Sequence, residues 1–131
     1  MKKYLIVLSI LLVILVSGCG SGDTNISDDK NDTTVNYNIS GKEAKEKNDR
    51  GAIIVDVRTV EEYNEGHIDG AILLPVASIN AETVLNYLPD KNAEIIVYCR
   101  SGNRSHQALQ KLKSLGYDNI YDLGSINNWE E

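Results

Sequence analysis

The chain has 131 residues, and 13 Lys and Arg side chains stand against 19 Asp and Glu side chains, so the formal net charge is −6 at pH 7. Without Lys2 and Lys3 the balance is 11 against 19, about −8, and no basic patch remains. Nucleic acids are bound through clustered Lys and Arg, so we expect no nucleic-acid partner. With only two histidines and two cysteines, we also expect no metal site and no cofactor.

The N-terminal residues form the pattern of a signal peptide, which we place at residues 1–18. Lys2 and Lys3 precede an apolar run, residues 4–16, that only Ser9 interrupts. A run of about 13 residues is shorter than the roughly 20 that a transmembrane helix needs. The residues before Cys19 read Val-Ser-Gly, and together with Cys19 they resemble a bacterial lipobox. That resemblance implies a diacylated Cys19 as the new N-terminus, and hence an extracytoplasmic protein anchored by lipid to the bacterial cell membrane.

Residues 19–34 contain a single large apolar side chain, that of Ile26. A segment of this composition cannot bury enough apolar surface to offset the entropy of ordering. We therefore expect a lipid-anchored, disordered tether over residues 19–34, followed by one compact domain over residues 35–131.

Strands and helices alternate through the expected domain. Alternating apolar residues predict an edge strand at 35–39, and Ser40 with Glu43 predicts a capping box that opens a short helix. Further strands are expected at 52–57, 71–74, 95–98 and 119–123, and helical segments at 60–65, at 81–88 and after the polar loop that follows Cys99. The alternation predicts an α/β fold with about five strands in a mostly parallel sheet and helices on both faces.

Cys99 stands where a buried strand meets a helix. The apolar run 95–98 leads into Cys99, and apolar residues at helical spacing follow the short polar loop. Unpaired N–H groups at a helix N-terminus favour an anion. With Arg100 and Arg104 nearby, they should lower the pKa of the Cys99 thiol from its free value of about 8.5. The alternatives are a buried structural cysteine and a disulfide with Cys19, which would consume this nucleophile.

Three segments resemble the rhodanese family of sulfurtransferases over roughly residues 35–129. The loop 99–104 is similar to the active-site loop of thiosulfate sulfurtransferases. The C-terminal segment resembles the family's last signature in Leu123, Gly124 and Trp129, although Ser125 stands where a second glycine is usual. An upstream signature is matched by Asp56-Val57-Arg58, Glu62-Tyr63, Gly66-His67-Ile68 and Gly70-Ala71.

The resemblance implies that Cys99 is the catalytic residue and carries a persulfide. It implies a small anionic sulfur donor such as thiosulfate, a thiol or cyanide as acceptor, and Asp56 and Arg58 as supports of the loop. The residues expected to bind substrate are Arg100, Ser101, Gly102, Asn103 and Arg104. His67 is expected to hydrogen-bond a turn, and His106 to be exposed.

Two alternatives stay open. Related phosphatases and arsenate reductases resemble this architecture with five residues between cysteine and arginine, whereas Cys99 and Arg104 enclose four and the next position is Ser105. That spacing favours sulfur chemistry. A second alternative is a sulfur-carrier domain that receives persulfide from a partner protein and turns over little free thiosulfate.

Overall fold

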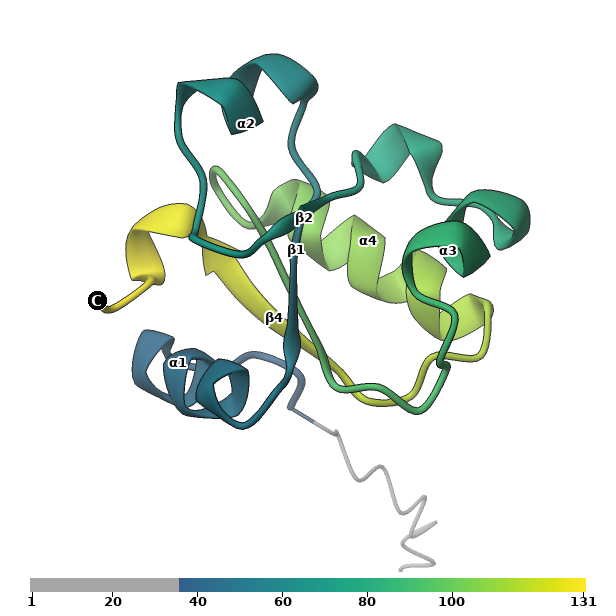
Figure 1. Ribbon diagram of the computed structural model, residues 1–131, viewed down its shortest axis with the longest axis horizontal. Helices are drawn as coiled ribbons and strands as arrows, with labels where there is room; N and C mark the ends of the chain where they lie inside the picture. Colours follow the sequence, from purple (N-terminus) through teal and green to yellow (C-terminus); the bar gives the residue numbers. More distant parts are fainter. Residues whose placement is uncertain (1–35) are drawn as a thin grey trace, which may run out of the picture. The chain divides into compact units, whose positions relative to one another are not determined.

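The structure, a computed structural model, describes residues 36–131 (Figure 1). The expected signal peptide at 1–18, the lipid attachment at Cys19 and the tether at 19–34 lie outside the described residues. Over residues 36–131, four parallel strands form one sheet in the order β2-β1-β3-β4. The strands are β1 (Ile53–Asp56), β2 (Ile72–Leu73), β3 (Ile95–Cys99) and β4 (Ile120–Ser125).

The helices cover both faces of this sheet, as expected. They are α1 (Gly41–Asp49), α2 (Val60–Glu65), α3 (Ala81–Tyr87) and α4 (Asn103–Ser114), with short 3₁₀ turns η1 (Val76–Ser78) and η2 (Ile126–Asn128). In Figure 1, α3 and α4 lie on one side of the strands and α1 lies on the other. The expected α/β fold class, a parallel sheet with helices on both faces, is thus confirmed.

The core is divided by the sheet into two clusters. Successive strand side chains point to opposite faces, so Val55 and Val97 join the cluster under α3 and α4, whereas Ile54 and Ile96 join the cluster that includes Ala44 of α1. Every residue of β3 is buried. A strand buried on both faces explains the continuous β-branched run that precedes Cys99.

The expected edge strand at 35–39 is reduced to a single bridge. Asn38 pairs in parallel with Asp122 of β4, and hydrogen bonds join Ile39 N–H to the Asp122 carbonyl and Asp122 N–H to the Tyr37 carbonyl. The Ser40 capping box starts α1 immediately afterwards. Because the chain turns away at that point, the sheet has four strands and a bridge rather than five strands.

Helix α1 has little apolar surface, yet it packs closely. Only Gly41 and Ala44 are buried. A Cβ atom on Gly41 would overlap the backbone carbonyl of Asn128 in η2. A glycine at the start of α1 therefore permits a close approach between the helix and the C-terminal segment.

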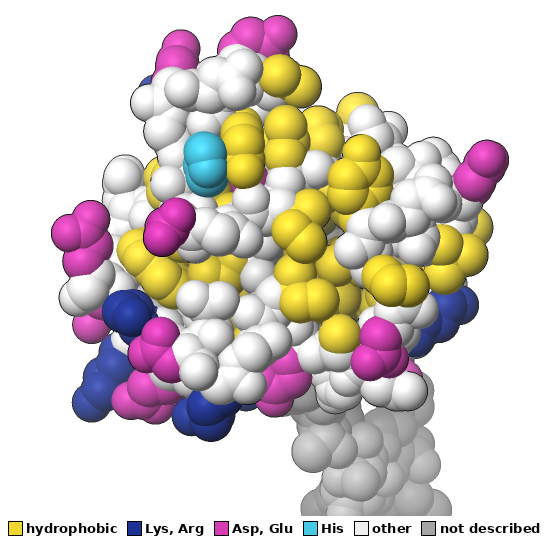
Figure 2. Space-filling view, in the orientation of Figure 1, with side chains coloured by type: hydrophobic (Ala, Val, Ile, Leu, Met, Phe, Trp, Pro, Cys, Tyr) yellow, Lys and Arg dark blue, Asp and Glu magenta, His cyan; other side chains and the backbone are white. Residues whose placement is uncertain are grey.

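The surface mixes charges of both signs around α1, while apolar side chains cross the middle of the face shown in Figure 2. On α3, Leu85 and Tyr87 are each about half exposed. None of the helices within residues 36–131 combines the length and the hydropathy that crossing a bilayer requires.

Candidate active site

Cys99 lies at the carboxyl edge of the parallel sheet, next to the point where the strand order reverses. The chain passes from β1 to β2 on one side and then returns to place β3 on the other side of β1. Sites in open α/β sheets gather outside the carboxyl ends of strands at such a reversal. Cys99 is the last residue of β3, and α4 begins at Asn103. The placement of the expected nucleophile between a strand end and a helix N-terminus is therefore confirmed.

The loop between β3 and α4 turns sharply around the sulfur. Gly102, the N-cap of α4, has φ 99°, a left-handed conformation that a glycine adopts without strain. Its N–H lies 3.0 Å from Cys99 Sγ. The turn therefore directs a backbone donor at the thiol.

The pKa of the Cys99 thiol is lowered in spite of its surroundings. Burial raises this pKa, and the N–H and hydroxyl groups of Ser105 oppose burial most strongly. The N–H groups of Gly102 and Ser101 add to that effect, and the net result is a lowered pKa. Hydrogen bonds to the thiolate favour the charged form, so the loop stabilises an anion at this position.

Ser105 is the donor that the sequence pattern did not reveal. It is fully buried on the first turn of α4, and its hydroxyl donates to the Gly102 carbonyl at 2.9 Å. Hydrogen bonds of the Ser105 N–H and hydroxyl are also the strongest of the effects that lower the pKa of the Cys99 thiol. In the longer loop of phosphatases and arsenate reductases the arginine would stand at position 105. This chain has a serine there, and its hydroxyl hydrogen-bonds to the Gly102 carbonyl of the same loop.

The loop covers the sulfur that it stabilises. Cys99 has no solvent-exposed surface, whereas Arg100, Ser101 and Asn103 are exposed. Because the Cys99 side chain has no exposed surface, a reactant reaches the sulfur only when the loop moves.

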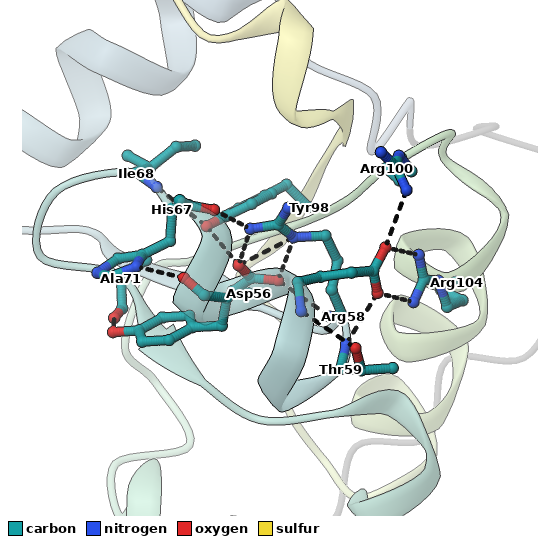
Figure 3. A network of polar contacts seen from close by, with 12 residues as sticks. Asp56, Arg58, Thr59, His67, Ile68, Ala71, Tyr98, Arg100 and Arg104 are labelled. Carbon is teal, nitrogen blue, oxygen red and sulfur yellow. Dashed lines mark hydrogen bonds and ion pairs between the residues drawn. The ribbon is translucent and has the colours of Figure 1, made fainter.

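Two arginines of the loop converge on the carboxylate of Glu62 (Figure 3). Arg104 binds it through two hydrogen bonds, Nη1 to Oε2 at 2.6 Å and Nη2 to Oε1 at 2.9 Å. Arg100 Nη1 lies 4.0 Å from Oε1, and the Arg100 side chain is 72% exposed. The ion pair holds Arg104 in place, while Arg100 projects into solvent.

This pairing corrects the expected cause of the thiol's acidity. The arginines were expected to lower the pKa of Cys99, but Arg104 is bound to Glu62, and the donors that face the sulfur are backbone N–H groups and the Ser105 hydroxyl. The negative charge of the thiolate does raise the pKa of Arg104, although the hydrogen bonds from Glu62 raise it more. The direct stabilisation of the thiolate therefore comes from neutral dipoles.

Glu62 joins helix α2 to the active-site loop. Its carboxylate accepts the Thr59 N–H at 3.1 Å, which completes a capping box at the start of α2. Hydrogen bonds from Arg104 first, and from the Thr59 backbone second, lower the pKa of Glu62 to about 2. Glu62 was noted only as part of a family pattern, and its structural role follows from a contact between residues far apart in the sequence.

Asp56 and Arg58 form a second buried centre at the neighbouring strand end. Arg58 donates to Asp56 through Nε at 2.9 and 3.1 Å and through Nη2 at 2.6 Å. The Tyr98 hydroxyl donates to Asp56 Oδ2 at 2.8 Å, and Arg58 Nη2 also donates to the Gly66 carbonyl at 2.7 Å. Burial first, and the hydrogen bond with Asp56 as well, raise the pKa of Tyr98.

This centre braces the segment after α2 rather than the sulfur. The Tyr98 hydroxyl accepts the Ile68 N–H at 3.1 Å, so the network runs from β1 through β3 to the segment containing Gly66 and Ile68 (Figure 3). Asp56 and Arg58 were expected to support the Cys99 loop, but the segment that their side chains hold is the one between α2 and β2.

His67 packs against Tyr63 of helix α2, and His106 lies at the surface. His67 stacks on the Tyr63 ring with centroids 3.6 Å apart, and its Nδ1 lies 2.9 Å from the Tyr63 carbonyl. His67 was expected to hydrogen-bond the turn between Gly66 and Gly70, but its contact is instead with Tyr63 in helix α2. His106 is exposed, with Nδ1 3.9 Å from Asp122 Oδ2. Within residues 36–131, no three His, Cys, Asp or Glu side chains gather into a metal-binding group.

Comparison with known proteins finds one family over nearly all of the described chain. The sequence pattern of the rhodanese-like domain matches residues 40–131. Thiosulfate sulfurtransferase PspE of Escherichia coli is 35% identical over 74 residues, covering 56% of this chain and 70% of that protein. A Bacillus subtilis protein, YrkF, whose name describes a sulfur carrier, is 34% identical over 79 residues, covering 60% of this chain and 41% of that protein.

Solved structures agree with the sequence matches. A structure described as a rhodanese with anions from E. coli superposes with a TM-score of 0.56 at 33% identity, covering 60% of this chain and 91% of that chain. Several matched adenylyltransferase and sulfurtransferase proteins are much longer, and the chain spans only 20–27% of their length.

Proposed function

Because the chain belongs to the rhodanese-like domain family, we propose that it transfers sulfane sulfur from thiosulfate, or a similar anionic donor, to a thiophilic acceptor through a persulfide on Cys99. The observation that carries this proposal is the convergence of loop donors on the Cys99 sulfur at the N-terminus of α4. A thiolate held by N–H groups is a nucleophile at neutral pH without a neighbouring base.

In the first step, the Cys99 thiolate attacks the outer sulfur of thiosulfate. A sulfur–sulfur bond forms to Cys99, the bond between the two thiosulfate sulfurs breaks, and sulfite leaves with the bonding electron pair. The charge is conserved, because a thiolate and a thiosulfate dianion become a persulfide anion and a sulfite dianion. Before the attack, hydrogen bonds from Gly102 and Ser101 stabilise the thiolate on Cys99, and after it the negative charge lies on the outer sulfur of the persulfide.

The arginines have separate roles in this proposal. Arg100 is 72% exposed and lies at the edge of the loop, so it attracts the incoming anion. Arg104 is held by Glu62 and fixes the shape of the loop. Asn103 begins α4, where the helix dipole adds a positive potential.

In the second step, a thiol or cyanide attacks the outer sulfur of the Cys99 persulfide, takes that sulfur and releases the Cys99 thiolate. A carrier function is the second candidate, supported by the match to YrkF and by the complete burial of Cys99. In that case a partner protein would open the loop and exchange sulfur directly.

Turnover of thiosulfate with cyanide, measured on the full chain, tests the proposal. We expect thiocyanate formation and a mass gain of one sulfur atom on Cys99 after thiosulfate alone. Cys99→Ser should reduce turnover at least about 1,000-fold, because the covalent nucleophile is lost, while thermal unfolding stays close to wild type. A sulfur adduct without turnover would favour the carrier, and the absence of both would refute sulfur transfer from free thiosulfate.

We also propose that Cys19 carries the lipid that anchors this domain outside the cytoplasm of a bacterial cell. The support is the sequence pattern at residues 1–19. We expect the wild-type chain to partition into the detergent phase with a mass above that of residues 19–131, and Cys19→Ala to lose the added mass. Recovery of an unacylated wild-type chain from the aqueous phase would contradict the anchor.

A further inference from the structure

The end of β4 touches the active-site loop through Ser125. In the sheet register, Ser125 is the partner of Cys99, after an irregularity in the pairing at Val97 and Tyr98. The Ser125 hydroxyl donates to the Arg100 carbonyl at 2.7 Å. The same oxygen accepts the Asn127 N–H at 3.2 Å, which caps η2. One hydroxyl therefore links the loop to the C-terminal segment.

The Arg100 carbonyl and the Ser101 N–H belong to the same peptide unit. In a planar trans peptide these two groups point in opposite directions. The Ser101 N–H is one of the groups that donate toward the Cys99 sulfur. A hydroxyl that holds the carbonyl on the β4 side of the loop thus also keeps the N–H turned toward the sulfur.

This arrangement depends on the residue type at position 125. A glycine, which is usual here in proteins that this chain resembles, has no hydroxyl to donate. The Arg100 carbonyl would then be free to hydrogen-bond with water, and the peptide unit could rotate at low cost. Every other group that faces the sulfur is set by the Gly102 turn or by α4, so the peptide between Arg100 and Ser101 is the part of the loop that needs this external tie.

We propose that Ser125 is a positioning residue of the active site: its hydroxyl fixes the peptide between Arg100 and Ser101 so that the Ser101 N–H faces Cys99 and the anion formed there. The inference rests on the proposed function only for its effect on turnover. Its effect on the Cys99 thiol can be measured without any sulfur donor.

The test compares Ser125→Ala and Ser125→Gly with Ser125→Thr in the full chain. The pH dependence of Cys99 alkylation by iodoacetamide gives an inflection that reports thiolate stability, and the plateau rate at high pH reports access to the sulfur. We expect the inflection to move up by about half to one pH unit in the alanine and glycine variants, as one neutral hydrogen bond warrants. Turnover, kcat/KM, should fall about three- to tenfold, and threonine should restore both values.

Asn128→Ala is the matched control for loosening of the C-terminal segment. Asn128 donates from Nδ2 to the Leu123 carbonyl at 2.8 Å and does not bond to the loop. The Asn128→Ala variant should keep the inflection in the pH dependence of Cys99 alkylation at the wild-type pH. If Asn128→Ala moves the inflection as far as Ser125→Ala does, the effect belongs to the segment and the proposal is overturned.

The two proposals fail in different ways. An unchanged inflection in both Ser125→Ala and Ser125→Gly would overturn the positioning role even if thiosulfate turnover is present. Absence of turnover in the wild type, together with the expected shift in inflection, would overturn the proposed function and leave the role of Ser125 supported.

Discussion

Asp56 at the end of β1 and Cys99 at the end of β3 are two buried ionisable groups at neighbouring strand ends. Their hydrogen-bond partners are of different kinds. Asp56 is held by a charged side chain and a phenol, Arg58 and Tyr98, in short side-chain hydrogen bonds. Cys99 is held mainly by backbone N–H groups and the Ser105 hydroxyl. Both groups have no exposed surface.

This difference in partners suits the Asp56 centre to holding the fold and the Cys99 centre to taking part in a reaction. In the Asp56 centre a carboxylate faces a guanidinium at 2.6 Å, so the charges of the pair compensate each other. In the Cys99 centre the groups that hydrogen-bond the thiol are neutral dipoles, while Arg104, whose pKa the thiolate charge raises, is hydrogen-bonded to Glu62. The charges of the Asp56 pair are already compensated, whereas oriented dipoles are suited to charge that appears and moves during a reaction.

The largest effect is expected from breaking the compensated pair. Asp56→Ala would leave the Arg58 guanidinium buried without its partner, at a cost of about 3–5 kcal/mol in the free energy of unfolding. Urea denaturation at pH 7 measures this. Replacing both residues by apolar ones, Asp56→Leu with Arg58→Met, should recover most of the loss.

Glu61→Ala is the control for removal of a carboxylate, because Glu61 is exposed on the next helix and should change stability by about 0.5 kcal/mol or less. Under conditions where Asp56→Ala is folded, its Cys99 alkylation inflection should match that of the wild type. If the inflection shifts as far as is expected for Ser125→Ala, the Asp56 and Cys99 centres are coupled, and the distinction between them does not hold.

A second, smaller effect is expected from a glycine inserted between Asn103 and Arg104. An inserted residue rotates the following part of α4 by about 100° relative to the loop. Arg104 then leaves Glu62, and Ser105 leaves the sulfur. We expect kcat/KM for thiosulfate to fall about 30-fold or more, which is roughly 2 kcal/mol.

The Asp56 centre does not contact the inserted residue, but the variant loses the pair between Arg104 and Glu62, so the free energy of unfolding should fall by at least about 1–2 kcal/mol. A glycine inserted between Pro89 and Asp90, both exposed in the connection from α3 to β3, is the matched control and should keep turnover. Wild-type turnover in the loop variant would show that the spacing from Cys99 to Arg104 does not select the substrate.

The smallest effect is expected at Glu62, which lies at the border of the Cys99 centre. Its pKa is lowered from 4.5 to about 2 by Arg104 and Thr59. The charged form is favoured in the folded state, so its contribution is fully present above about pH 4.5 and is lost as pH falls toward about 2. Glu62→Gln should therefore lower stability at pH 7 by about 1–2 kcal/mol, a value reduced by solvent screening.

The difference in stability between wild type and Glu62→Gln should shrink on acidification from pH 4.5 to pH 2. Chemical denaturation across this range gives the difference curve, and Glu61→Gln, on the exposed side of α2, is the control for replacement of a carboxylate. A constant difference at all these pH values would mean that the carboxylate acts by its shape and not by its charge.

Local patterns in the sequence predicted those parts of the fold and the site whose residues lie close together in the sequence. The buried strand before Cys99, the helix after Gly102 and the capping box at Ser40 each follow from residues within a few positions of one another. The layered α/β fold followed from the alternation of such elements. The expected edge strand became a bridge because the Ser40 cap redirects the chain.

Contacts between distant residues were not predictable in this way. The pairing of Glu62 with Arg104, and that of Tyr98 with Asp56, each joins residues 42 positions apart. The upstream family pattern contained Glu62 without giving its partner. Ser125 was visible as a departure from the usual glycine, and only the register of β4 against β3 brings its hydroxyl to the Arg100 carbonyl.

The close approach of Gly41 to Asn128 has a consequence for the order of folding. The first helix of the domain docks on residues that are synthesised much later than the helix itself, because the Asn128 carbonyl occupies the space beside Gly41. Contacts of such high sequence separation slow the acquisition of the native state. Helix α1 therefore gains its final packing only after residue 128 has left the ribosome, and a chain shortened before η2 leaves the beginning of this domain unpaired.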